Sequence, residues 1–241
     1  GLFNRFYKII KSTIYIFNCI KKNEIDLVYI NTSVIWSGVL ASYFSKRKSV
    51  VHIHEIPYGS NMYNLISGLF FKFFADSIIV VSKKVRDHWG SFINFKKIKV
   101  IYNYSQYFET ENSKKINKKQ SEFIISNISR IVPQKGIEYL IEISKELIKF
   151  DKKFKINIIG GTLKGSENYL KFLKKIVKKN DLEKNVFFRG FKNDIKKVIL
   201  ESDLILQTPI KPDSLPTVII DSLTLNRPII STDTGGCLEI L

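Results

Sequence analysis

The sequence predicts an α/β protein built on two parallel sheets. Short apolar runs, typical of buried strands, alternate with longer runs in which apolar residues recur at helical spacing. The strand-like runs are apolar along their whole length, as in DLVYI at 26–30, which is typical of parallel sheets covered on both faces. A charged stretch at 105–121, poor in apolar residues, divides the alternation into two blocks. We therefore expect two Rossmann-like domains joined by a linker.

The first block begins with an amphipathic helix at 2–20, in which apolar side chains recur from Phe3 to Ile20. Further helices are expected at 34–45, 61–74 and 83–89. Strands are expected at 26–30, 49–53, 78–81 and 98–102.

The second block repeats the alternation. Its strands are expected at 122–129, 154–160, 185–189 and 203–207, and its helices at 136–149, 167–180 and 193–200. We place a first domain at 1–108, a linker at 109–121 and a second domain at 122–241. Both domains are expected to be incomplete, because the first lacks an opening strand with a Gly-rich turn and the second stops just after a Gly-Gly loop.

Composition narrows the class of protein. The 241 residues give room for one large or two small domains, and 44% of them are apolar, as in globular proteins. A net charge of +17 suits nucleic acid or an anionic membrane surface, although a general abundance of Lys, Asn and Ile also explains it. No apolar run approaches the roughly 18–20 residues of a membrane span. The 2 cysteines are too few for a disulfide framework, so we expect a cytoplasmic location.

The most informative stretch is QTPIKPDSLPTVIIDSLTLNRPIISTDTGG, residues 207–236. Its pattern predicts a strand, a loop, a helix over Thr217–Leu225, a strand and a Gly-Gly loop. Pro216 suits the first turn of that helix, where a missing N–H group costs nothing. The N–H groups at such a helix start bind anions. Those expected to do so belong to Ser214, Leu215, Thr217 and Val218.

Two carboxylates, Asp213 and Asp221, bracket this helix start with seven residues between them. A carboxylate accepts hydrogen bonds from paired sugar hydroxyls, while the neighbouring amides suit a phosphate. The combination indicates a pocket for a nucleotide sugar. The alternative is a turn-forming Asp213 and a solvated Asp221, because Asp is common at turns and helix ends.

This stretch resembles the acid-x7-acid signature of retaining glycosyltransferase family 4, which has the GT-B fold. The resemblance covers roughly residues 24–241 and implies two domains facing a cleft, with the missing ends outside this chain. The chain departs from the usual signature at several positions. Asp replaces Glu at both acidic positions, Ser222-Leu223 stands where Ala-Met is usual, and Asn226 stands where Gly is usual.

Arg130 and Lys135 lie in a loop between a strand and a helix, where both side chains can converge on one anion. Two solvated loop residues are the alternative. The family carries a Gly-Arg-Leu segment followed by Lys-Gly at this place, and the resemblance implies that Arg130 and Lys135 hold the donor diphosphate. Gly136 matches the family pattern, and Ser129 replaces its first Gly.

Residues at other strand ends are weaker candidates. His52 and His54 share one face of a strand, and either a metal site or a packed pair fits this spacing. The resemblance implies that His54 contacts the donor sugar or the acceptor, and we add Asn31, at the end of the preceding strand, as a substrate-binding candidate. By the same resemblance, the candidates for contacts to the base and donor are Arg189, Phe191 and Gly160.

We therefore expect a retaining glycosyltransferase that moves a hexose-type sugar from a UDP-, GDP- or ADP-sugar to a glycan or lipid-linked acceptor. The resemblance implies bacterial surface polysaccharide assembly, no metal and no cofactor, with the protein in the cytoplasm or on the inner face of the membrane. A nucleotide-sugar epimerase of the same fold is one alternative, and a basic nucleic-acid or membrane binder is another. No nucleic acid is expected, because no RNA- or DNA-recognition motif is present.

Overall fold

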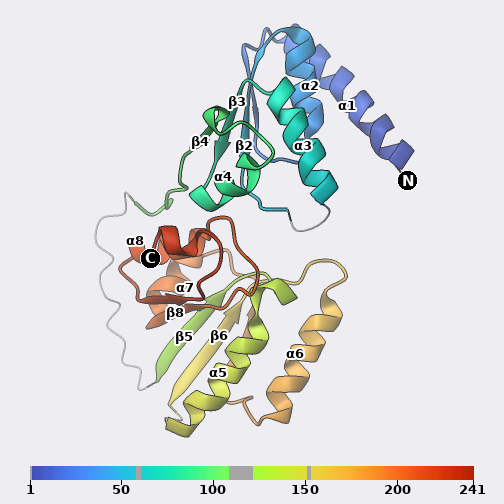
Figure 1. Cartoon of the computed structure of the whole chain (residues 1–241). Coiled ribbons are helices and arrows are strands. Elements are labelled where there is room, and N and C mark those ends of the chain that lie inside the picture. The colour runs from blue at the N-terminus through green and yellow to red at the C-terminus, as the bar shows by residue number, and fades with distance from the viewer. Residues whose placement is uncertain (1, 58–60, 109–121, 151–152) are drawn as a thin grey trace. The chain divides into compact units, whose positions relative to one another are not determined.

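The computed structural model describes residues 2–57, 61–108, 122–150 and 153–241. The chain forms two compact units, Gly1–Asn103 and Tyr104–Leu241 (Figure 1). The predicted linker at 109–121 lies outside the described residues. Both units are α/β with parallel strands, so the predicted fold class is confirmed.

The first unit contains a parallel sheet in the order β1-β2-β3-β4. Its strands are β1 (Leu27–Ile30), β2 (Lys48–Ile53), β3 (Ser77–Val80) and β4 (Ile98–Val100). Residues 51, 53, 78 and 80 of the inner strands are fully buried, whereas residues 50, 52 and 79 between them are only partly buried. Burial of each fully buried side chain stabilises the fold by about 1.5–3 kcal/mol.

The helices of the first unit are α1 (Leu2–Lys22), α2 (Trp36–Ser45), α3 (Asn61–Phe74) and α4 (Lys83–Gly90). Helix α1 packs along α2, and α2 in turn contacts β1 and β2. Ser82 caps α4 by accepting a hydrogen bond from the N–H group of Val85 at 3.2 Å. Trp89 of α4 is fully buried, and its indole N–H donates to the backbone carbonyl of Glu55, at the end of β2, at 3.3 Å.

The second unit contains a parallel sheet in the order β7-β6-β5-β8-β9. Its strands are β5 (Phe123–Ile128), β6 (Phe154–Ile159), β7 (Val186–Gly190), β8 (Leu204–Gln207) and β9 (Ile229–Ser231). Since β5 lies between β6 and β8, the strand order reverses at β5. Open α/β sheets bind ligands beyond the carboxyl ends of their strands at such a reversal.

The helices of the second unit are α5 (Ile137–Phe150), α6 (Glu167–Lys179), α7 (Ile195–Glu201) and α8 (Thr217–Thr224). Helices α5 and α6 lie side by side on one face of the sheet (Figure 1). The main core lies beneath them, around residues such as Leu140, Ile156 and Leu173. A smaller core around Ile199 and Ile205 lies on the opposite face, toward α7 and α8.

Short 3₁₀ turns complete both units: η1 (Phe95–Lys97), η2 (Pro133–Lys135) and η3 (Gly236–Glu239). The structure also corrects one local prediction. Pro216 is not inside the first turn of α8 but is its N-cap, with φ −68° and ψ 112°. Its ring fixes φ near a helical value, but its ψ is extended, so the helix begins at Thr217, as predicted.

Candidate active site

The loop after β5 presents two cations at the carboxyl edge of the second sheet. Arg130 follows the strand directly, and Lys135 ends the 3₁₀ turn η2. Gly136 then takes φ +60°, and a Cβ atom there would lie 2.0 Å from the carbonyl oxygen of Thr208. Only glycine permits this approach, so the loop holding Lys135 sits directly against the end of β8.

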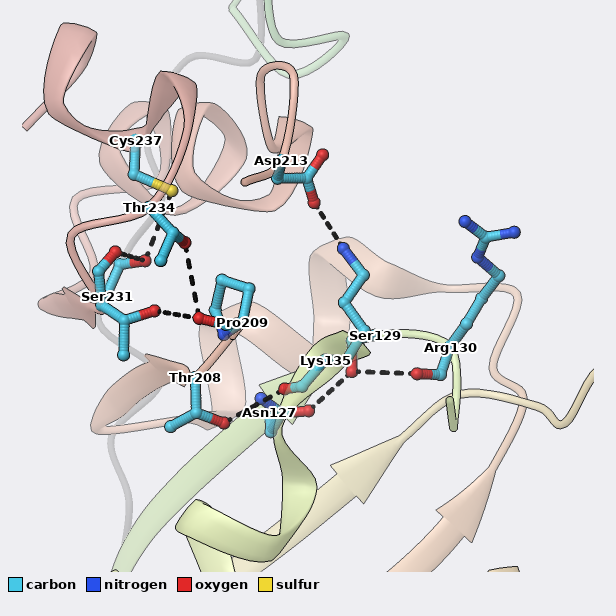
Figure 2. Close-up of polar contacts among 11 residues, drawn as sticks. Asn127, Ser129, Arg130, Lys135, Thr208, Pro209, Asp213, Ser231, Thr234 and Cys237 are labelled. Carbon is cyan, nitrogen blue, oxygen red and sulfur yellow. Dashed lines mark hydrogen bonds and ion pairs between the residues drawn. The ribbon is translucent and has the colours of Figure 1, made fainter. Parts of the chain in front are cut away.

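The side chains of Lys135 and Asp213 form an ion pair, and both are about a quarter exposed (Figure 2). The Arg130 guanidinium lies on the same side as the Lys135 side chain but makes none of the contacts drawn in Figure 2. Lys135 and Asp213 are thus brought together although 78 positions separate them in the sequence.

Backbone contacts hold the loop that carries Asp213. The N–H group of Gly236 donates to the carbonyl oxygen of Asp213 at 2.8 Å. Gly235 has φ +67°, and a Cβ atom there would lie 2.0 Å from the same oxygen. Thr232 also donates its hydroxyl to the carbonyl of Pro209 at 2.6 Å. The Gly-Gly loop therefore acts as a support for the acidic loop.

Asp221 lies on the second turn of α8 and accepts a hydrogen bond from the Ser105 hydroxyl at 2.6 Å. Burial raises the pKa of the Asp221 carboxyl, and the bond from Ser105 partly offsets that rise. Ser105 is itself buried, and its oxygen accepts from the N–H group of Tyr107 at 3.1 Å. The first residues of the second unit thus fix the carboxylate in place.

These residues line one cavity of about 450 Å³. Seven predicted site residues line it: Arg130, Lys135, Asp213, Leu215, Thr217, Val218 and Asp221. Its wall at the start of α8 is made by Leu215, Pro216, Thr217 and Val218. A single space of the size that a nucleotide needs is therefore surrounded by two cations, two acids and the start of a helix.

Other predicted residues of the second unit lie apart from this lining. Arg189 donates from Nε to Asn157 at 2.8 Å, stacks 4.5 Å from the Phe187 ring and lines separate hollows. Phe191 is 74% exposed. Gly160 packs against the backbone of Ser129, where a Cβ atom would lie 1.8 Å from its carbonyl oxygen. The backbone of Ser214 packs against Gly236.

The first unit has a polar cluster of its own at the carboxyl ends of β1 and β2. His54 and Asn31 are hydrogen-bonded through Nε2 and Oδ1 at 2.7 Å. Beside them, Oε1 of Glu55 accepts three hydrogen bonds at 2.6–2.7 Å. The donors are the Thr32 hydroxyl, the Ser33 hydroxyl and the N–H group of Ser33. The other carboxylate oxygen of Glu55 accepts from the N–H group of His54 at 3.0 Å. The two predicted residues, Asn31 and His54, thus lie together.

His52 packs on His54 with ring centroids 4.0 Å apart, and its Nδ1 is hydrogen-bonded to the Tyr29 hydroxyl. Burial, assisted by His54, lowers the pKa of His52. Within the described part of the chain, no group of three or more His, Cys, Asp or Glu residues is arranged to hold a metal ion. His52 and His54 thus form the packed pair that was one of the two alternatives for the His-x-His spacing.

The lining residues that were not predicted include Gln106, Tyr107 and Gln207. Gln106 and Tyr107 precede the second sheet, in a stretch whose composition indicated a linker. Gln207 is the polar last residue of an otherwise apolar strand, and that polarity is the signal by which it could have been found.

Two α/β units, each with a parallel sheet, are typical of the GT-B fold, and solved structures confirm this fold class. A HepE protein from Anabaena, solved in complex with UDP and glucose, matches with a TM-score of 0.84 and 24% identity, over 95% of this chain and 64% of that one. A glycosyltransferase from Rickettsia africae matches with a TM-score of 0.80 and 23% identity, over 97% of this chain and 64% of that one.

The chain belongs to the family of glycosyl transferases group 1, which matches residues 108–241. Residues 1–104 match Glycosyltransferase Family 4. An uncharacterized glycosyltransferase of Methanocaldococcus jannaschii, MJ1059, is 28% identical over 98% of this chain and 62% of its own length. A poly(ribitol-phosphate) alpha-N-acetylglucosaminyltransferase of Staphylococcus aureus is 30% identical over 47% of this chain and 22% of its own. The chain thus spans less than two thirds of these relatives.

Proposed function

We propose that the protein is a retaining glycosyltransferase that transfers a hexose-type sugar from a nucleotide-diphosphate sugar to a glycan or lipid-linked acceptor. The observation that carries this proposal is the shared cavity of Arg130, Lys135, Asp213 and Asp221. Of the possible donors we favour a UDP-sugar, because the HepE protein with a similar fold was solved with UDP and with UDP-glucose.

The proposed mechanism is electrostatic. Departure of the sugar leaves negative charge on the β-phosphate, and fixed positive groups placed where that charge grows lower the barrier. Arg130 and Lys135 supply two full charges, and the N–H groups of Thr217 and Val218 add the positive end of α8. These groups neutralise the leaving diphosphate without a metal ion, so we expect transfer to persist in EDTA.

The acids take the hydroxyl-bearing parts of the donor. Asp221, held by Ser105, is assigned to the ribose hydroxyls, and Asp213 to hydroxyls of the transferred sugar. Binding of the diphosphate draws Lys135 away from Asp213, which frees that carboxylate to accept the sugar hydroxyls. The ion pair between Lys135 and Asp213 is thus an arrangement that the donor replaces. In the first unit, His54 with Asn31 is assigned to the sugar or the acceptor.

A thermal-shift panel of UDP-, GDP- and ADP-sugars tests donor binding. We expect one class to raise the unfolding midpoint, and Lys135→Ala to abolish that rise. Lys171→Ala, on the exposed face of α6, is the matched control and keeps it. If no nucleotide sugar shifts the midpoint of the whole protein, the proposal is wrong. NMR of the product anomer decides whether transfer retains configuration, and a donor-only incubation separates transfer from epimerisation.

The described helices include none long and apolar enough to span a membrane. We propose instead that the first unit touches the anionic inner face of the cell membrane. Helix α3 exposes apolar side chains, among them Met62, Leu65, Ile66 and Phe73. The turn after α2 adds the basic residues 46–48. Cosedimentation with vesicles containing anionic lipid, and its loss at high salt, tests this location.

A further inference from the structure

Gln207 is a buried polar side chain with an unused donor in the wall of the cavity. The residue is 5% exposed, and its Nε2 atom has no hydrogen-bond partner among the described residues. Buried amides are nearly always satisfied in native proteins, and one that is not calls for a specific explanation.

The strand alternation shows which way Gln207 faces. Successive residues of a strand point to opposite faces of the sheet, so Gln207 shares a face with Ile205 and not with Leu206. Leu206 packs into the core under α5 and α6, whereas Ile205 packs with Val218 in the core toward α8. Gln207 therefore projects on the α8 side, at the carboxyl end of β8.

That side is where the cavity lies. Its lining includes Ile128, Ile195 and Val218, which pack around the same smaller core as Ile205. The other buried side-chain atoms without partners in the described ranges belong to Trp36, His52, Asn64, Ser67, His88 and Arg227. None of these six residues lines the cavity, whereas Gln207 does.

We propose that Gln207 is a donor-binding residue, whose side-chain amide hydrogen-bonds an oxygen of the nucleotide part of the donor. This inference rests on the proposed function and adds a residue to its site. The described residues offer no acceptor to the buried Nε2 atom of Gln207, and the nucleotide supplies one. Binding thus removes an unfavourable state of the free protein as well as forming a contact.

The test compares Gln207→Leu with the wild type, using UDP and UDP-glucose as probes. Leucine has a similar volume and removes the unsatisfied amide. We expect the ligand-free variant to unfold at the wild-type midpoint or above it, while its affinity for UDP falls about 10-fold, the loss expected for one buried hydrogen bond. Gln207→Met serves as a second apolar variant if the leucine does not fold. Gln134→Leu, an exposed glutamine outside the lining, is the control.

The outcomes separate the two proposals. Suppose that Gln207→Leu or Gln207→Met binds UDP as tightly as the wild type and has a lower ligand-free midpoint. The amide is then structural, and this inference is wrong. If Lys135→Ala abolishes UDP binding in the same series, the proposed function stands without Gln207. If the wild-type protein binds neither UDP nor UDP-glucose, both proposals fail.

Discussion

The carboxyl edges of the two sheets both carry a buried or half-buried acid, but they use it differently. In the first unit, Glu55 accepts four hydrogen bonds from residues 32, 33 and 54 and so joins two strand ends. In the second unit, Asp213 forms an ion pair with one cation, Lys135, and both residues line the cavity. The first edge is a closed network, whereas the second is an exchangeable pair that a ligand can separate.

The difference shows how two similar sheets can serve different tasks. Four donors on one carboxylate fix backbone geometry, because each donor left unpaired by a change would be costly. A single partly exposed ion pair contributes little to stability, so its partners remain available for a ligand. Stability and ligand exchange should therefore respond to opposite sets of substitutions.

Lys135→Ala is expected to have the largest effect. Loss of a fixed charge at the developing phosphate charge should lower kcat about 100-fold or more, with little change in folding stability. Steady-state transfer assays with a saturating acceptor measure this loss. Lys171→Ala should keep wild-type kcat, and a Lys135→Ala enzyme with unaltered turnover would remove the lysine from the mechanism.

Glu55→Gln should act on stability. The glutamine retains one acceptor oxygen but presents an NH2 group where Oε2 accepted from His54, so we expect the free energy of unfolding to fall by about 1–3 kcal/mol. Denaturant unfolding followed by far-UV circular dichroism measures this. UDP affinity should stay within about 2-fold of wild type. A variant as stable as wild type would contradict the description of this edge as a closed network.

Asp213→Asn should change UDP affinity and leave folding stability almost unaltered, the reverse of Glu55→Gln. It removes a negative charge beside the phosphate site and frees Lys135, so UDP should bind about 3- to 10-fold more tightly while transfer slows. The free energy of unfolding should change by less than about 1 kcal/mol. Calorimetric titration with UDP is the measurement, and weaker UDP binding would show that the ion pair is not an arrangement that the donor replaces.

Asp221→Asn should produce the smallest effect, and one that depends on pH. Burial raises the pKa of this carboxyl, so the folded protein binds a proton more readily than the unfolded chain, and stability falls as pH rises from the ordinary value of 3.8 through the raised pKa. At pH 7 the asparagine removes that cost, and we expect the midpoint to rise by about 1–3 °C. The difference should vanish below pH 3.8, and a constant difference would contradict it.

Much of the fold could be predicted because short runs rich in apolar residues alternate with longer runs that show helical spacing. Arg130, Lys135 and Asp213 follow strands β5 and β8, and parallel strands bring such loops to one edge, so their meeting was predictable. Pro216 was expected in the first turn of α8 and not at its N-cap, because propensity does not reveal its ψ. The roles assigned to these residues stay predictions.

Residues whose contacts are distant in sequence could not be found this way. Ser105 lies 116 positions from Asp221, and no pattern in either stretch relates them. Gln207 ends an apolar strand, but its unsatisfied amide emerges only once the packing around β8 is known. Long-range hydrogen bonds of this kind depend on the tertiary structure and have no local signature.

The acidic loop of the second unit is fastened mainly through its main chain. The carbonyl oxygens of Pro209 and Asp213 accept from Thr232 and Gly236, and the N–H group of Ile210 donates to the carbonyl of Gln134. Side chains along this loop can consequently be exchanged while its path is kept. A library confined to residues 210–212 and 214 would therefore vary the surroundings of Asp213 on an unchanged backbone, and is a direct way to look for altered sugar preferences.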